Sequence, residues 1–172
     1  MKKKKKTSII IIRTAALIIC VATMIAIFLF SSQNAESSGS ASGGISDKII
    51  ELFRPNFSGL SPEKQARIRE RVDVIVRKGA HFIEFAILGI SVSLLLLTFS
   101  DKKIFTVAVP IAFSAFYAVT DEVHQLFVAG RAGMLTDVLI DSLGAAVGVL
   151  ALNAVALIVK KSKNRETDID KE

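Results

Sequence analysis

Three short stretches of this 172-residue chain carry ionisable and amide side chains beside long apolar runs. His81 and Glu84 are three residues apart, and Asp137 and Asp141 are four apart, so each pair would share one side of a helix. The third stretch supplies Asp121, Glu122, Gln125 and Arg131. Imidazole and carboxylate groups can transfer protons, and guanidinium groups bind phosphate or carboxylate. The three stretches therefore predict a polar site.

The elements that must position these side chains are helices in a lipid bilayer. Apolar residues make up 51% of the chain, and the mean hydropathy is +0.51. A bilayer core about 30 Å thick needs about 20 apolar residues per helix, and its backbone groups must be paired within the segment. Four segments meet or approach this length: 8–30, 79–99, 104–120 and 138–159. We therefore predict an all-α membrane protein with a bundle of four transmembrane helices.

The positive charges predict how this bundle is oriented. The net charge is +6, and basic residues cluster at 2–6, 102–103 and 160–165, each beside an apolar run. Such clusters are typical of the cytoplasmic side of a membrane protein. We predict that the N-terminal residues 1–7 and a solvated tail at 160–172 are cytoplasmic, and that the chain spans the cell membrane. This distribution of charge also argues against a nucleic-acid partner.

The predicted outer loop, residues 31–78, contains a tether and a helix. The sequence SSGSASGG at residues 37–44 is typical of a flexible linker. Ser61-Pro62-Glu63 predicts a helix start, and an apolar stripe follows at Ile68, Val72, Ile75 and Val76. A short amphipathic helix of this kind lies in the membrane interface or on the outer mouth of the bundle. A solvated connector and an arm that binds lipid headgroups are both compatible with it.

In this orientation the polar residues of three helices converge in the outer third of the membrane. A charged side chain at a helix centre costs about 2.5–3.5 kcal/mol to insert, so intramembrane ionisable residues are functional candidates. The alternative is that they hold the helices together, at about 0.6 kcal/mol per pair. One or two contacts would suffice for that purpose, so the cluster favours a functional site. For His124 and Asp137, which are nearer the headgroups, both interpretations are open.

Other features indicate structure. Gly144 and Gly148 form a GxxxG run, which favours a close helix contact and is one surface through which the chain could form a homo-oligomer. Pro110 is expected to bend the third helix, and Arg13 is expected to reach the cytoplasmic interface. Cys20 is the single cysteine of the sequence, so an intrachain disulfide is excluded. It lies in the first apolar run, which we interpret as a retained membrane anchor.

The order of these polar residues resembles the VanZ-like family. The pattern comprises Lys78-x-x-His81-x-x-Glu84, then Asp121-Glu122-x-x-Gln125-x-Phe127-x-x-x-Arg131 and Asp137, with Phe30-Ser31-Ser32-Gln33 at the end of the first helix. Phe85 stands where Tyr is common in the family, and Asp141 where Asn is common. The resemblance covers nearly the whole chain. It implies a Gram-positive cell-envelope protein that affects susceptibility to teicoplanin, and it supplies neither a reaction nor a cofactor.

Two mechanisms are compatible with this resemblance. In an enzyme acting on a lipid-linked or wall precursor, Glu122 or Glu84 would be the general base and His81 its partner. Arg131 and Lys78 would then hold a phosphate or carboxylate.

In a non-catalytic binder, Arg131 and the basic helix at residues 61–78 would capture an anionic lipid, an acyl tail or a lipid-linked precursor. Lys78 and Asp141 are counted among the binding residues in either mechanism.

A metal-dependent enzyme or a cation pathway is favoured less. The carboxylates and histidines offer enough ligand atoms, but no H-E-x-x-H spacing occurs, and we assign no metal ligand from the sequence. The inner halves of the helices contain almost no ionisable groups, with Asn153 as the main polar residue. Carboxylates spread through the depth of the membrane would be expected of a cation pathway.

Overall fold

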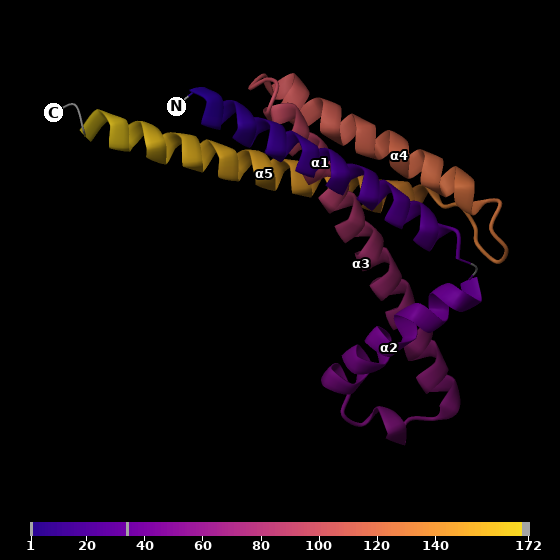
Figure 1. Ribbon diagram of the computed structural model, residues 1–172. Coiled ribbons are helices and arrows are strands. Elements are labelled where there is room, and N and C mark those ends of the chain that lie inside the picture. The colour runs from indigo at the N-terminus through magenta and orange to yellow at the C-terminus, as the bar shows by residue number, and fades with distance from the viewer. Residues whose placement is uncertain (1, 34, 170–172) are drawn as a thin grey trace.

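The computed structural model describes residues 2–33 and 35–169, without the side chains of 2–6, 35–42, 163 and 166–169. Within these residues every regular element is helical (Figure 1): α1 Lys2–Ser31, α2 Ala35–Phe53, η1 Phe57–Gly59, α3 Pro62–Leu97, η2 Ile104–Ala108, α4 Val109–Gln125 and α5 Leu135–Ile169. In the described part of the chain, four helices are long and apolar enough to cross a membrane: Thr7–Ser31, Pro62–Leu97, Ile104–Gln125 and Leu135–Ser162. The predicted all-α bundle of four such helices is confirmed. The side chains of the basic block at residues 2–6 and the end of the predicted tail at 170–172 lie outside the described part.

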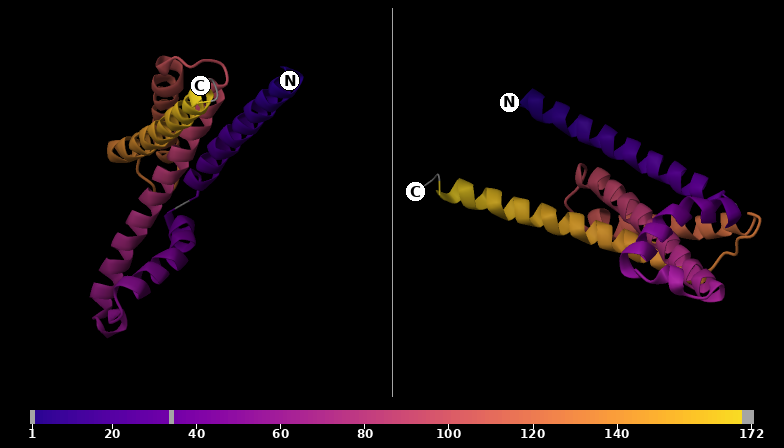
Figure 2. Two further views of the ribbon diagram at one scale, coloured as in Figure 1. Left: turned by 90° about the vertical axis from the view of Figure 1, so that its left-hand side faces the viewer. Right: turned by 90° about the horizontal axis from the view of Figure 1, so that it is seen from below.

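The long helices alternate in direction, and α3 crosses the others obliquely (Figures 1 and 2). α1 and α4 both end, and α5 begins, at the end of the bundle where residues 126–134 connect α4 to α5. We call this the loop end. The start of α1 and the far part of α5 lie toward the opposite end of the bundle, apart from each other (Figures 1 and 2).

Small residues let α3 and α5 pack closely. A Cβ atom at Gly144 or Gly148 would clash with the backbone carbonyl of Phe82 or Ala86 in α3. The GxxxG run is therefore a close helix contact within one chain, as predicted. Because α3 occupies this face, a second copy cannot pack on these two glycines, and a homo-oligomer stays a prediction without an assigned surface.

Pro110 disturbs the start of α4, and a buried polar network repairs the disturbance. Proline has no N–H, so the Thr106 carbonyl loses the donor it would have in a regular helix, and η2 is a π-helical turn at this place. Ser93 Oγ and Asn153 Nδ2 donate to the Thr106 carbonyl oxygen at 2.6 and 2.9 Å. Asn153 Oδ1 accepts from Lys103 Nζ at 3.2 Å. The isolated polar residue Asn153 thus has a structural role.

α1 is attached to its neighbours at two levels. At the end opposite the loop end, Arg13 donates to the side chain and the carbonyl of Thr98, at 2.9 and 2.7 Å, just after the end of α3. Arg13 therefore satisfies a helix terminus instead of only reaching the interface. Nearer the loop end, Tyr117 Oη donates to the Met24 carbonyl oxygen at 2.8 Å.

The amphipathic helix predicted in the outer loop is the first part of α3. Ser61 is its N-cap and Pro62 its first residue, as predicted, and the helix continues to Leu97 without the expected break near residue 79. Residues 37–44 lie in helix α2, so the expected flexible tether is wrong. α2 packs on α3 away from the main bundle (Figure 1), and its residues Ser46 and Ile50 are buried.

Candidate functional site

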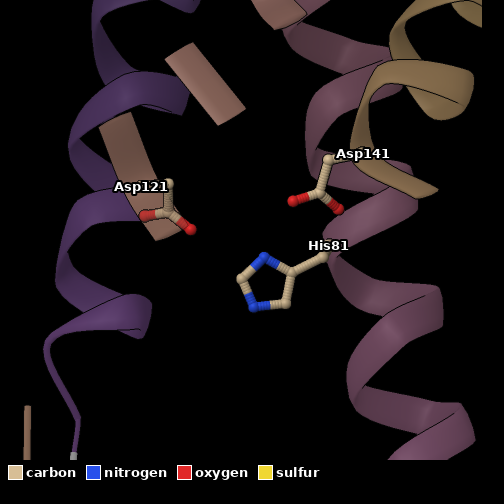
Figure 3. A group of neighbouring side chains, drawn as sticks. All are labelled: His81, Asp121 and Asp141. Carbon is tan, nitrogen blue, oxygen red and sulfur yellow. The ribbon is translucent and has the colours of Figure 1, made fainter. Parts of the chain in front are cut away.

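A polar pocket of about 230 Å³ opens at the loop end, between α3, α4, α5 and the connecting loop. Seven predicted site residues line it: Lys78, His81, Glu122, Gln125, Arg131, Asp137 and Asp141. The other two, Glu84 and Asp121, are not part of the lining. Asp121 is close to His81 and Asp141 (Figure 3), and Glu84 is one turn further along α3 than His81. The structure therefore brings together residues from three helices, and two of them, Lys78 and Asp141, are 63 positions apart in the sequence.

The loop over the pocket has a backbone that needs glycine. Gly130 has a φ of 75°, which L side chains rarely adopt. A Cβ atom at Gly133 would lie 2.7 Å from the carbonyl oxygen of Glu122, so only glycine lets the loop approach the end of α4. The Glu122 carboxylate accepts a hydrogen bond from the backbone N–H of Met134 at 2.7 Å. Glu122 thus fixes the loop immediately before α5.

Arg131 connects this loop to the end of α1. Its Nε donates to the Gln33 carbonyl oxygen at 2.9 Å, and its Nη2 donates to that of Phe30 at 3.2 Å. These carbonyls follow or end α1, where backbone acceptors have no partner within the helix. The interactions place Arg131 beside the Phe30–Gln33 segment.

Two further cations lie at the pocket on α3. Lys78 forms a half-buried ion pair with Asp137 of α5. Arg77, which lies in the basic helix predicted at residues 61–78, also lines the pocket and has no hydrogen bond or ion pair among the described residues. Its role at the pocket could have been predicted from the sequence, because Arg77 is four residues before His81 and this spacing places both on one helix face. Burial lowers the pKa of the Arg131 guanidinium, and the charge of Arg77 lowers it further, so these two cations are close enough to repel each other.

The inner part of the site is buried. Asp121 is 4% exposed, and its Oδ2 accepts hydrogen bonds from Ser31 Oγ at 2.9 Å and Gln125 Nε2 at 3.0 Å. Asp141 is 1% exposed, and neither of its carboxylate oxygens has a hydrogen-bond partner among the described residues. His81 Nδ1 lies 4.0 Å from Glu84 Oε2, which is too long for a hydrogen bond.

His124 lies apart from the pocket. Its ring stacks on Phe28 with the centroids 4.6 Å apart, and its Nε2 is 3.0 Å from Ser32 Oγ. The pocket lining does not include it. Of the two readings left open for this residue, the contacts favour attachment of α1 to α4.

Four membrane-spanning helices with a polar pocket at one end define a multi-pass membrane protein. The sequence model of the VanZ/LLP1 family matches residues 16–158, which covers most of the bundle, and the chain belongs to this family. The resemblance found in the sequence is thereby confirmed. No curated protein and no solved structure matches the chain.

Proposed function

We propose that the pocket binds the anionic headgroup of a membrane lipid or a lipid-linked envelope precursor, and that this binding lowers susceptibility to teicoplanin. In this proposal the loop end faces outward and both termini are cytoplasmic. The observation that carries it is the presence of Arg77, Lys78 and Arg131 around one pocket in an apolar bundle. Membership of the VanZ/LLP1 family supports a link to resistance.

The charges in the pocket favour an anionic ligand. Arg131 is held by carbonyl groups and Lys78 by Asp137, so both cations are fixed in position before a ligand arrives. Arg77 has no such partner among the described residues and can donate to a ligand. An anion between Arg77 and Arg131 would relieve their repulsion, and a guanidinium binds phosphate through two parallel hydrogen bonds.

The size of the pocket decides what enters it. Pockets for drug-sized molecules have volumes of about 300–1,000 Å³. The 230 Å³ observed is below this range, so the pocket can hold a headgroup but cannot enclose a glycopeptide antibiotic. Protection would therefore arise from a bound envelope component and not from capture of the drug.

The contacts favour binding over acid–base catalysis. Glu122 is occupied by the loop backbone, and His81 is not hydrogen-bonded to Glu84. In a binder, charge matters more than acid–base identity. Glu122→Gln, which keeps the acceptor for Met134, should then be tolerated, whereas a general base would not tolerate the loss of its carboxylate.

Susceptibility to teicoplanin in a sensitive Gram-positive host tests the proposal, with membrane abundance measured for each variant. We expect wild type to protect, Arg77→Gln and Arg131→Gln to lose protection, and Arg77→Lys to retain part of it. Lys161→Gln is the matched control because it removes an exposed cation on α5 far from the pocket. If the arginine variants protect as well as Lys161→Gln, the pocket does not carry the function. If Glu122→Gln and Glu122→Asp both abolish protection at normal abundance, a catalytic site replaces the binding site.

A further inference from the structure

Three potential ligand side chains meet inside the bundle at the inner side of the pocket. His81 comes from α3, Asp121 from α4 and Asp141 from α5, and one ligand atom from each lies within 4.8 Å of the other two. Figure 3 shows the imidazole ring of His81 between the two carboxylate groups. We propose that these three residues bind one divalent transition-metal cation. The inference concerns a separate ligand and does not depend on the proposed headgroup function.

The state of Asp141 is independent support for a ligand. Its side chain is almost fully buried, and both oxygens have no hydrogen-bond partner in the described part of the chain. His81 Nδ1 is likewise buried without a partner. Buried polar groups in proteins are nearly always paired, and an unpaired buried carboxylate is especially unfavourable. A cation between Asp141 and His81 would satisfy both.

Asp121 is already oriented as a ligand would be. Ser31 of α1 and Gln125 of α4 both donate to its Oδ2, at 2.9 and 3.0 Å. Donors of this kind orient a coordinating carboxylate in metal sites. A divalent cation would give the carboxyl groups of Asp121 and Asp141 a common partner.

The ligand types indicate the class of metal. One imidazole nitrogen and two carboxylate oxygens suit Zn²⁺ or Mn²⁺, whereas Mg²⁺ and Ca²⁺ prefer oxygen ligands alone. Ligand atoms about 2.1 Å from one ion are at most about 4.2 Å apart, so small side-chain rotations would close the observed spacing. Three protein ligands leave a coordination position open toward the pocket, which His81 and Asp141 line.

Zn²⁺ binding to the purified full-length protein in detergent tests this site. After removal of metal with a chelator, Zn²⁺ is titrated in competition with a fluorescent chelator, and Mg²⁺ is titrated in parallel. We expect one Zn²⁺ per chain, with the affinity reduced at least about tenfold in Asp141→Asn and in His81→Gln. Asp137→Asn is the matched control, because it removes a carboxylate one turn away in the same pocket but outside the group of three.

Thermal unfolding with and without Zn²⁺ separates loss of the site from loss of the fold. Zn²⁺ should raise the unfolding temperature of wild type and Asp137→Asn, and it should not raise that of Asp141→Asn. Metal-free Asp141→Asn should be at least as stable as metal-free wild type, because it removes a buried carboxyl group that has no hydrogen-bond partner among the described residues. Absence of Zn²⁺ binding to wild type, or equal binding by wild type, Asp141→Asn and His81→Gln, would overturn the proposal.

Discussion

Replacing Gly144 with alanine should force α3 and α5 apart. A Cβ atom at this position would lie closer than 3.0 Å to the carbonyl oxygen of Phe82. Comfortable carbon–oxygen contacts between helices are about 3.3–3.6 Å, so the helices must separate by about 1 Å. The obstacle is backbone, which cannot rotate away as a side chain can. Overpacking of this kind costs about 1–3 kcal/mol, and we expect Gly144→Ala to lower the free energy of unfolding by this amount.

The same shift should disturb the pocket. Phe82 follows His81 directly, and Asp141 lies one turn before Gly144, so the α3–α5 distance also sets the distance between these two site residues. A site that depends on side-chain positions within a fraction of an ångström is sensitive to such a change. Gly144→Ala should therefore weaken ligand binding as well as stability.

Unfolding of the purified protein in mixed detergent micelles, followed by circular dichroism, measures the effect. Gly79→Ala is the matched control, because a Cβ atom at Gly79 meets nothing within 4 Å. This control should be neutral or stabilising by up to about 1 kcal/mol, since alanine favours a helix over glycine. Equal stability of Gly144→Ala and wild type would refute the packing argument.

Three further changes test the contacts around this core. Asn153→Leu should lower the free energy of unfolding by about 1 kcal/mol in the same assay, because the Thr106 carbonyl loses a donor. An unchanged free energy of unfolding would show that the Ser93 hydroxyl alone satisfies this carbonyl. A double-mutant cycle of Lys78→Gln and Asp137→Asn should give a coupling free energy of about 0.5–1 kcal/mol, and a value of zero would remove the ion pair from the account. Glu122→Ala should increase hydrogen exchange in the loop at 126–134, whereas Glu122→Gln, which keeps an acceptor, should not; equal exchange in both would contradict the loop-fixing role.

The four spans could be predicted because the physics of a bilayer acts on composition alone. The segments around α2 and α3 could not. The change from charged to apolar residues near Gly79 suggested a boundary, but an isolated glycine does not interrupt helix hydrogen bonding, so α3 continues through it. The Gly/Ser-rich residues 37–44 suggested a tether, but α2 packs on α3 and buries Ile50. Tertiary contact here outweighs local preference.

That the polar residues of α3, α4 and α5 form one site could be predicted from their depth in the membrane, because residues at the same level of antiparallel helices are near each other. Depth says nothing about rotation around each helix. The assignment of His124 to α1 packing, and of Arg77 to the pocket, depends on which side of α4 and α3 faces inward. The partner of Arg131 was also beyond reach, since backbone carbonyls of a distant helix end leave no mark in the sequence.

The two ends of the bundle differ in how completely their polar groups are paired. Near Asn153 the Asn153 amide, the Ser93 hydroxyl and the Thr106 carbonyl are paired with one another, and among the described groups there the Thr106 hydroxyl has no partner. At the loop end, Arg77 has no described partner on one side of the pocket and Asp141 has none on the other. A cation held by Asp141 would add positive charge beside Arg77 and Arg131, so the two proposed ligands would strengthen each other's binding. Coupling between two binding sites is reciprocal, so a bound anionic headgroup should raise the affinity for Zn²⁺ by the same factor by which bound Zn²⁺ raises the affinity for the headgroup.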